Sequence, residues 1–391
     1  MEENKETMNT PAEFDEIRPY SPEELPQVFE ELLADPMFQS VVKAAIPDMT
    51  EEKLRHVLSR CRTNLDVQKN IFYSLLLKLI SEHSDGFKLD VSALPDKSCN
   101  YTFISNHRDI VLDPGFLSVG LLQNGFPTTV EIAIGDNLLI YPWIKKLVRV
   151  NKSFIVQRAL SMRQMLESSA RMSRYIHFAV TRKHENIWIA QREGRAKDSN
   201  DHTQESVLKM LAMGGEGDAI DRLEELNIVP LSLSYEYDPC DFLKAQEMQQ
   251  KRDIEGFKKT QADDLNNMRT GIFGYKGRVH FQAAPCINAE LETLRGLPRT
   301  EVFGRVASII DRHIHKNYSL YPGNYVACDL LEEGNRFATQ YTAGDKARFE
   351  TYLQKKLDMI TLEHKDGPFL RKCMLTMYAN PVFNHLKALE A

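Results

Sequence analysis

The sequence predicts an α/β protein with a mixed, largely parallel sheet flanked by helices, a helical N-terminal domain and a helical C-terminal extension. Two observations support this fold class. Between residues 96 and 300, short runs rich in β-branched and aromatic residues alternate with stretches of helical periodicity. The segments on either side are helical in pattern. The 391 residues therefore divide into a flexible arm at 1–20, a helical domain at 21–95, an α/β domain at 96–300 and an extension at 301–391.

The composition is typical of an ordinary globular protein, with 42% hydrophobic and 27% charged residues. A net charge of −6 argues against a nucleic-acid partner. The six cysteines are scattered singly, which indicates a reducing cytoplasm, and no metal-ligand spacing predicts a metal site. The acidic N-terminus lacks the apolar region of a signal peptide. The longest apolar-rich run, 71–80, is too short to span a bilayer, so we expect any membrane contact to be peripheral.

The N-terminal domain begins with a helix start signal. Ser21, Pro22 and Glu24 have the spacing of an N-cap, a first helical residue and the glutamate of a capping box. Helical periodicity continues at 50–61 and 65–83. We therefore expect helices throughout this part of the chain, up to about residue 84.

The α/β domain contains six runs with the composition of strands. They lie at 101–105, 129–134, 153–157, 187–191, 228–237 and 276–287. Between the third and the fourth, residues 161–180 place apolar side chains three, four or seven positions apart, as in an amphipathic helix. Because strands that alternate with helices form βαβ units, most neighbouring strands should be parallel. Further helices are expected in the extension, at 300–318, 343–360 and 367–379.

A histidine and two aspartates follow the first predicted strand, in the stretch FISNHRDIVLDPGF. A carboxylate that accepts the Nδ1 proton of His107 makes the other ring nitrogen a general base. Asp109 and Asp113 are both candidates for that partner. Asp113 precedes Pro114 and is also a natural helix N-cap. We expect Asp113 to be the main partner, and Asp109 to make a local turn or face solvent.

Cations are concentrated between residues 143 and 197, which hold 13 Lys or Arg and three Glu. Arg158 ends one predicted strand, and Arg192, Arg195 and Lys197 follow another. Ligands of open α/β sheets bind beyond the carboxyl ends of the strands, and the arginine fork matches phosphate oxygens. The alternative explanation for these cations is a solvated helix face.

Four stretches resemble, in this order, the four sequence blocks of the glycerolipid acyltransferase superfamily, which includes glycerol-3-phosphate and 1-acylglycerol-3-phosphate acyltransferases. They are NHRDIVLDP, NKSFIVQR, IAQREGRAKD and NIVPLSLSYE, and the resemblance covers about residues 100–290. The chain departs from the pattern in three places. Five residues instead of four separate His107 from Asp113. Asn151 or its neighbour stands where the second block usually begins with glycine, and Glu193-Gly194-Arg195 lacks the threonine of the third block.

The resemblance implies transfer of a fatty acyl group from acyl-CoA or acyl carrier protein to a hydroxyl of glycerol-3-phosphate or lysophosphatidate, without a cofactor. It implies that the catalytic residues are His107, Asp113 and Asp109, and that the substrate-binding residues are Arg158, Arg192, Glu193, Gly194, Arg195 and Lys197. Dihydroxyacetone phosphate or an acyl amino acid is the alternative acceptor. A catalytically silent lipid-binding relative is the alternative to an enzyme. We expect a cytoplasmic protein, and peripheral contact with the inner face of the membrane, through residues 138–149, remains open.

Overall fold

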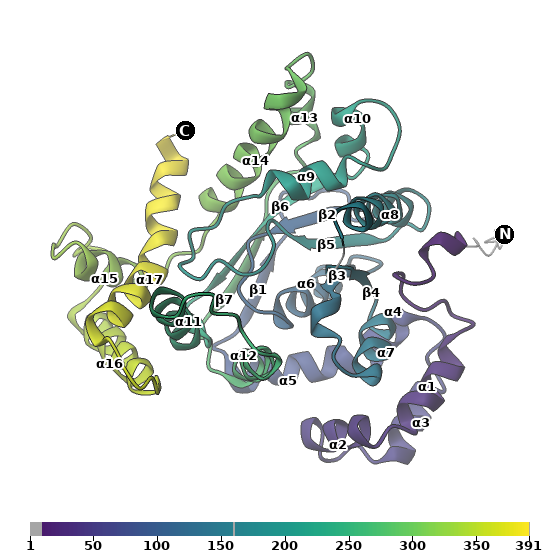
Figure 1. Cartoon of the computed structure of the whole chain (residues 1–391), viewed down its shortest axis with the longest axis horizontal. Helices are drawn as coiled ribbons and strands as arrows, with labels where there is room; N and C mark the ends of the chain where they lie inside the picture. Colours follow the sequence, from purple (N-terminus) through teal and green to yellow (C-terminus); the bar gives the residue numbers. More distant parts are fainter. Residues whose placement is uncertain (1–9, 159–160, 391) are drawn as a thin grey trace.

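The computed structural model describes residues 10–158 and 161–390, and its centre is a seven-stranded mixed sheet with helices on both faces (Figure 1). The strands are β1 (Phe87–Asp90), β2 (Thr102–Ser105), β3 (Val130–Gly135), β4 (Ser153–Val156), β5 (Asn186–Ala190), β6 (Ile228–Tyr235) and β7 (Val279–Ala283). Their order in the sheet is β1-β7-β6-β2-β5-β3-β4. Neighbouring strands are parallel except for β6 and β7, which are antiparallel. The predicted α/β fold class is confirmed.

Both faces of the central strands are buried, which explains why their sequences are continuous apolar runs. On β2, Phe103 packs on one side of the sheet with Leu231 and Trp188. Its neighbour Ile104 packs on the other side, in the core that also contains Ile189. The alternation of side chains along a strand thus divides the interior of the α/β domain into two cores.

Helices cover each face of the sheet (Figure 1). One face is covered by α5 (Tyr73–His83) and α6 (Leu112–Gln123). The other face is covered by α8 (Met162–Thr181), α9 (Glu205–Leu211), α10 (Ala219–Glu224), α13 (Asn288–Glu292) and α14 (Arg299–Lys316). Along the sheet, β2 connects past β5 to β3, whereas β5 connects in the opposite direction, past β2, to β6. The carboxyl ends of β2 and β5 therefore flank the point at which the direction of winding changes, where α/β proteins bind ligands.

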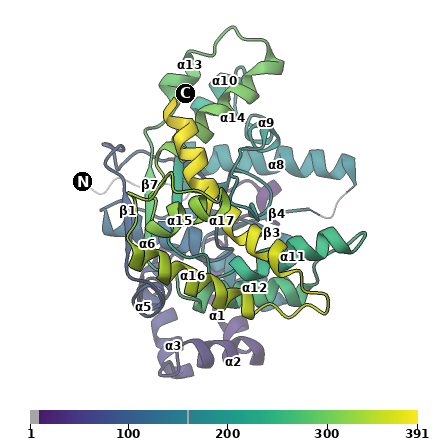
Figure 2. The same cartoon turned by 90° about the vertical axis from the view of Figure 1, so that its left-hand side faces the viewer.

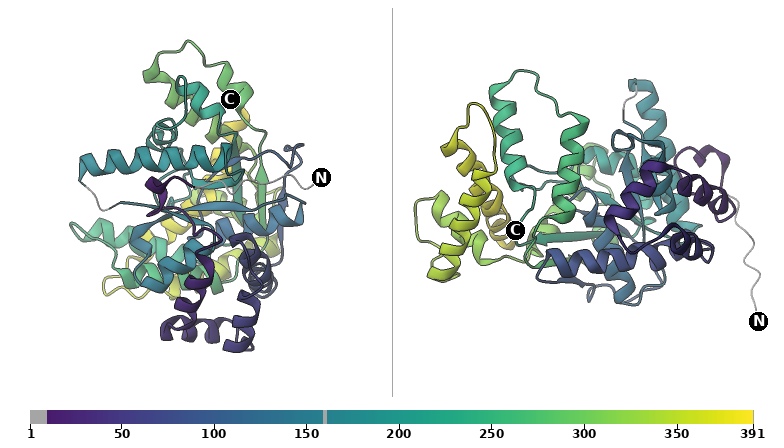
Figure 3. Two further views of the ribbon diagram at one scale, coloured as in Figure 1. Left: turned by 90° about the vertical axis from the view of Figure 1, so that its right-hand side faces the viewer. Right: turned by 90° about the horizontal axis from the view of Figure 1, so that it is seen from below.

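The N-terminal helices form a small core of their own. They are α1 (Leu25–Leu33), α2 (Pro36–Ala45) and α3 (Glu51–Leu58), the purple helices of Figure 3. They pack with α7 (Pro142–Val150), and α4 (Asn64–Val67) leads on toward α5. The Ser21 N–H donates to the Glu24 carboxylate over 2.6 Å, as predicted for the start signal. The helix nevertheless begins at Leu25, with Glu24 as its N-cap residue.

The C-terminal extension also has its own core. It contains α15 (Pro322–Leu331), α16 (Ala343–Asp358) and α17 (Gly367–Glu390), which lie together in Figure 2 and pack against α11 (Asp241–Asp253). Helices α11 and α12 (Gln261–Phe273) lie between β6 and β7 in the chain. The helix α15 was not predicted, and α17 continues through Pro381 to Glu390, beyond the predicted end.

The structure differs from the sequence-based expectation in two further places. The short strand β1 was not predicted. Of the expected flexible arm, residues 1–9 lie outside the described part of the chain, whereas Phe14 and Ile17 are buried in the core beneath α8 because their apolar side chains gain by burial. No helix in the described ranges is long and apolar enough to cross a membrane.

Candidate active site

The loop after β2 is fixed by the side chain of Asn106. Its amide Nδ2 donates to the Leu233 carbonyl oxygen over 2.9 Å, and its Oδ1 accepts the Leu233 N–H over 2.8 Å. These two bonds continue the β2–β6 ladder by one side chain beyond the end of β2. His107, the next residue, is therefore held at the carboxyl edge of the sheet. The ring of His107 lies edge-on to the Trp188 ring, with 5.5 Å between their centroids.

His107 and Asp113 are directly hydrogen-bonded. Nδ1 of the imidazole is 2.8 Å from Oδ2 of the carboxylate. The same carboxylate oxygen accepts the backbone N–H groups of Arg108 (2.7 Å) and Asp109 (3.0 Å). Asp113 has no exposed surface, and it lies in the first turn of α6, where the helix dipole stabilises negative charge. The acceptor-only carboxylate requires the proton of the His107–Asp113 bond to reside on Nδ1, which leaves Nε2 as the basic nitrogen.

Asp109 makes a local turn, as one of the two expectations had it, but its side chain is buried and does not face solvent. Its Oδ1 accepts the N–H groups of Val111 (2.8 Å) and Leu112 (2.7 Å), so Asp109, not Asp113, caps the start of α6. Its carboxylate is buried against Gly271 of α12. A Cβ atom at position 271 would lie 1.9 Å from Oδ2, so only glycine fits there. Burial, followed by the charge of Asp113, raises the pKa of the Asp109 carboxyl.

A cavity of about 220 Å³ opens beside His107 at the carboxyl ends of β3 and β5. Its apolar wall includes Ile110, Ile134, Leu138 and Trp188. Its polar wall is formed by His107, Arg158, Arg192, Gly194, Arg195, Lys197, Lys259 and Asp264. Five of the six residues expected to bind substrate thus line the same cavity as the expected base. The sixth, Glu193, has an exposed side chain that lies 3.4 Å from an Arg158 nitrogen.

The two arginines that follow β5 carry nitrogen atoms without protein partners. Arg195 is buried, and its Nη2 donates to Asn267 Oδ1 over 3.1 Å. Two guanidinium nitrogens of this cavity are buried and have no partner in the described part of the chain, and Nη1 of Arg195 is one of them. Nε of Arg192 is the other. A buried N–H group without an acceptor is costly unless a ligand or water supplies one. An anion in the cavity would supply it.

The remaining cations of the cavity are partly neutralised by carboxylates. Lys197 and Lys259 both lie near Glu247 of α11, with Nζ–Oε2 distances of 2.8 and 3.3 Å. Burial, and next the charge of Arg195, lowers the pKa of the Lys197 ammonium to about 8. Burial raises the pKa of the Glu247 carboxyl, but the bonds from Lys197 and Lys251 and the charge of Lys259 together lower it to about 2. Near neutral pH the cavity therefore carries more positive than negative charge.

Two of the stretches that resemble acyltransferase blocks contain a residue with a left-handed backbone conformation. Gly194 adopts φ +68°, in the left-handed region that favours glycine, so the loop after β5 keeps its glycine-dependent turn. In the second block, the left-handed residue is Lys152, with φ +58°, where a glycine would be expected. Its buried ammonium donates to Thr128 and Thr129 and pairs with Glu185 over 2.6 Å. These contacts stabilise an unfavourable backbone conformation.

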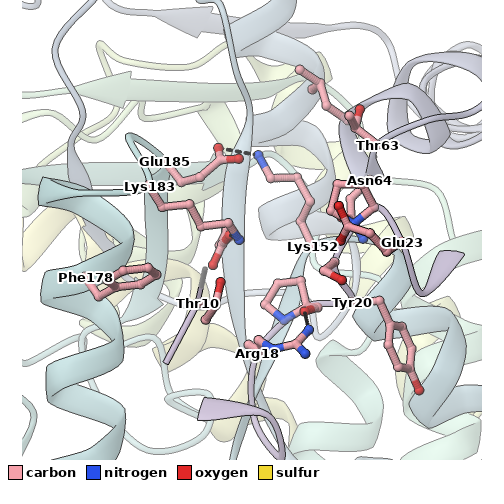
Figure 4. Close-up of a pocket in the computed structure, with 15 residues that line it drawn as sticks. Thr10, Arg18, Tyr20, Glu23, Thr63, Asn64, Lys152, Phe178, Lys183 and Glu185 are labelled. Carbon is pink, nitrogen blue, oxygen red and sulfur yellow. Dashed lines mark hydrogen bonds and ion pairs between the residues drawn. The ribbon is translucent and has the colours of Figure 1, made fainter. Parts of the chain in front are cut away.

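Lys152 also lines a second, larger cavity, of about 390 Å³ (Figure 4). Lys152 and Glu185, which both line it, directly precede β4 and β5, so it lies at the amino ends of these strands. Most of its charged side chains form ion pairs. Lys152 pairs with Glu185, Lys183 with Glu131, and Arg18 with Glu24. None of the described residues that line it is a histidine. We therefore assign the candidate reaction to the smaller cavity beside His107.

Sequence reasoning missed three groups that organise the site. Asn106 was seen without a role. Arg108 forms a buried bidentate ion pair with Asp201, in the loop after the arginines. Tyr235, the last residue of β6, donates to Asp113 Oδ1 over 2.9 Å. Its only sequence signal was its place in the fourth block, five residues after Pro230.

The segment expected to contact a membrane is packed differently. Trp143 is buried among the N-terminal helices, with its ring 6.1 Å from that of Phe38, and Lys146 pairs with Glu31 over 2.8 Å. Trp143 is therefore part of the core of the N-terminal domain. Leu138 of the same segment does line the cavity beside His107.

Comparisons with known proteins add a likeness of fold only. No protein-family model matches the chain, and no curated protein sequence matches it. Among solved structures, the chain is similar to the 1-acyl-sn-glycerophosphate (LPA) acyltransferase PlsC from Thermotoga maritima. The identity is 11%, the TM-score is 0.37, and the match covers 74% of this chain and 95% of that one. A likeness at this level assigns no activity, so function must be argued from the site itself.

Proposed function

We propose that this protein is an acyltransferase that moves a fatty acyl group from a thioester to a hydroxyl of a phosphorylated glycerol acceptor. The observation that carries the proposal is the arrangement of the cavity. A histidine oriented by a buried aspartate faces the same 220 Å³ space as four cations at strand ends. The order of the four sequence blocks, which resemble those of the glycerolipid acyltransferases, supports the same reaction.

The base in this reaction is Nε2 of His107. It takes the proton of the acceptor hydroxyl while that oxygen attacks the thioester carbon. The carbon–oxygen bond forms, the carbon–sulfur bond breaks when the tetrahedral intermediate collapses, and the imidazolium returns its proton to the departing thiolate. Asp113 keeps the proton on Nδ1 and stabilises the imidazolium. A general base of this kind contributes about 10²–10⁴-fold to the rate.

The phosphate of the acceptor binds the arginines of the cavity. Arg195 Nη1 and Arg192 Nε are buried donors with no partner among the described residues, and Arg158 and Lys197 add positive charge to the same cavity. Binding the phosphate at a fixed distance from His107 places the free hydroxyl of a short glycerol backbone at the base. Charge-assisted bonds of this type contribute roughly 1.5–3 kcal/mol each.

The acyl chain needs apolar surface, which gains about 0.8 kcal/mol for each buried CH₂ group. Ile110, Ile134, Leu138 and Trp188 supply such surface beside the histidine. For acceptors that reside in a bilayer, the exposed Met162 and Leu166 at the start of α8 offer apolar surface. Peripheral contact with a membrane is part of this proposal and uses those residues in place of Trp143.

Product identification tests the proposed function directly. The purified protein is incubated with a labelled acyl group on either coenzyme A or acyl carrier protein, and with one of four acceptors. These are glycerol-3-phosphate, lysophosphatidate, dihydroxyacetone phosphate and an acyl amino acid. We expect an ester product with a phosphorylated acceptor. If a labelled acyl chain binds but no ester forms with any donor and acceptor, the protein is a silent lipid-binding relative.

A further inference from the structure

The second oxygen of the Asp113 carboxylate has a partner of its own. Oδ2 accepts His107 and two backbone N–H groups, whereas Oδ1 accepts the hydroxyl of Tyr235 over 2.9 Å. Tyr235 is 122 residues away in the chain and belongs to β6. It is the only side-chain donor to Oδ1 within the described ranges. Because an ionised carboxylate only accepts, the direction of this bond is fixed.

The phenol ring is held as firmly as the hydroxyl. Tyr235 is buried, and its ring centroid lies 5.9 Å from that of Phe281 on β7. Burial, followed by the charges of Asp113 and Asp109, raises the pKa of Tyr235 well above its usual value, so the group remains a donor. A rigid donor on one oxygen restricts rotation of the carboxylate about its Cβ–Cγ bond. The other oxygen then stays directed at the imidazole.

We propose that Tyr235 is a positioning residue of the reaction, which orients the Asp113 carboxylate and draws part of its negative charge away from His107. The inference rests on the proposed function. It means that Tyr235, at the end of β6, helps to set the basicity of His107. Other charged groups act on the residues around this pair. Asp109 and Asp238 act on Tyr235, and Arg195 and Lys276 act on Asp109. The Arg108 guanidinium is paired with Asp201.

The sign of the expected effect follows from this arrangement. In Tyr235→Phe the carboxylate loses a donor, so its charge acts more strongly on the imidazole and the ring holds its added proton to higher pH. The acid limb of the pH profile of kcat/KM should therefore move upward by about 0.5–1 pH unit. The freed carboxylate also orients His107 less well, so kcat at the plateau should fall about tenfold. KM for the acceptor should stay within about twofold, because no phosphate contact changes.

The experiment compares Tyr235→Phe with Tyr341→Phe. Tyr341 donates to Asp329 over 2.8 Å in the C-terminal extension, so this control loses the same kind of bond far from the cavity. Both variants are measured for kcat, KM and pH profile. The titration of the His107 ring is followed by nitrogen NMR, with signals assigned from His107→Gln. We expect the acid limb of the kcat/KM profile and the NMR titration of His107 to move to higher pH in Tyr235→Phe and to stay in place in Tyr341→Phe. If neither midpoint moves in folded Tyr235→Phe, the inference is overturned.

A ring-fluorinated tyrosine at position 235 gives an independent test that keeps the fold. Fluorine makes the phenol a stronger donor, so both midpoints should move to lower pH, opposite to the effect of phenylalanine. If Tyr235→Phe does not fold, the fluorotyrosine variant alone tests the inference. Unchanged midpoints of the pH profile and of the His107 titration in that variant overturn it. The NMR titration requires no turnover. If the His107 titration follows Tyr235 but no acyl transfer is found, the proposed function is rejected, and only the coupling of Tyr235 to His107 through Asp113 is upheld.

Discussion

Arg108 and Asp201 form a buried bidentate ion pair that joins the loop after β2 to the loop after β5. Nη1 donates to Oδ1 over 2.9 Å and Nη2 to Oδ2 over 2.5 Å. Asp201 is also held from the C-terminal side, because Tyr318 donates its hydroxyl to Oδ2 over 2.6 Å and His315 Nε2 contacts its backbone oxygen over 2.7 Å. The residue that follows His107 is thus fixed by the segment that ends α14.

Breaking this pair should destabilise the whole protein. In Asp201→Asn the buried guanidinium loses its counter-charge, and we expect the free energy of unfolding to fall by about 3–5 kcal/mol. Glu30→Gln is the matched control, because Glu30 pairs with Arg55 at the surface and should cost less than about 1 kcal/mol. Chemical denaturation measures both. Equal losses in the two variants would show that the Arg108–Asp201 pair does not hold the loops.

The two aspartates of the first block should respond differently to substitution. Asp113→Asn removes the charge that stabilises the imidazolium and should lower kcat by up to about 10⁴-fold. Asp109→Asn keeps a side-chain oxygen for the N–H groups of Val111 and Leu112, so kcat should fall no more than about tenfold. Steady-state kinetics on folded variants compares them. A greater loss of kcat in Asp109→Asn would reverse the roles assigned here.

The arginines of the cavity should differ in their effect on acceptor binding. Arg195 is buried with a nitrogen free for an anion, whereas Arg158 is more exposed and already near Glu193. Arg195→Gln should therefore raise KM for a phosphorylated acceptor by about 10- to 100-fold, and Arg158→Gln by less. Arg163→Gln, whose side chain is 90% exposed, is the control. If Arg195→Gln leaves KM unchanged, the phosphate does not bind at this arginine.

Acceptor binding should weaken at alkaline pH through Lys197. Burial lowers the pKa of its ammonium to about 8, so the side chain is charged below that pH and loses its charge above it. KM for a phosphorylated acceptor should then rise between about pH 8 and pH 9.5. Lys197→Arg should abolish the rise, because a guanidinium stays protonated throughout. The pH dependence of KM in both proteins measures this, and an equal rise in Lys197→Arg would assign it to another group.

Much of the fold was predictable because it depends on local patterns. The strands of the α/β domain are continuous apolar runs, and the helix at 162–181 has clear periodicity. The edge strand β1 was missed because only Leu89 of its four residues is buried, which leaves no run to detect. The helix α17 was predicted too short because Pro381 indicates a helix end, yet tertiary packing around Tyr378 and Val382 carries the helix past it.

The site was predictable only where sequence order places groups together. His107 and Asp113 lie in one block, and the cations follow two neighbouring strands. Aspartate is a preferred N-cap residue, so Asp109 and Asp113 were equally suitable as the cap. Which of them caps the helix depends on the loop conformation. Tyr235 lies 122 residues from Asp113, and Asp201 lies 93 residues from Arg108, so no pattern near His107 identifies either contact. Buried Lys152 forms an ion pair with Glu185, and a contact between residues so far apart in sequence is likewise not predictable from a local pattern.

The most direct test of the account is the rate of acyl transfer in His107→Gln. Glutamine keeps polarity and approximate size but does not act as a base near neutral pH. His202→Gln is the matched control, because His202 is an exposed histidine that contacts Asp311 away from the cavity. We predict a loss of about 10²–10⁴-fold in kcat for folded His107→Gln and a change of less than about twofold for His202→Gln. A folded His107→Gln that transfers acyl groups at the wild-type rate would contradict the central claim.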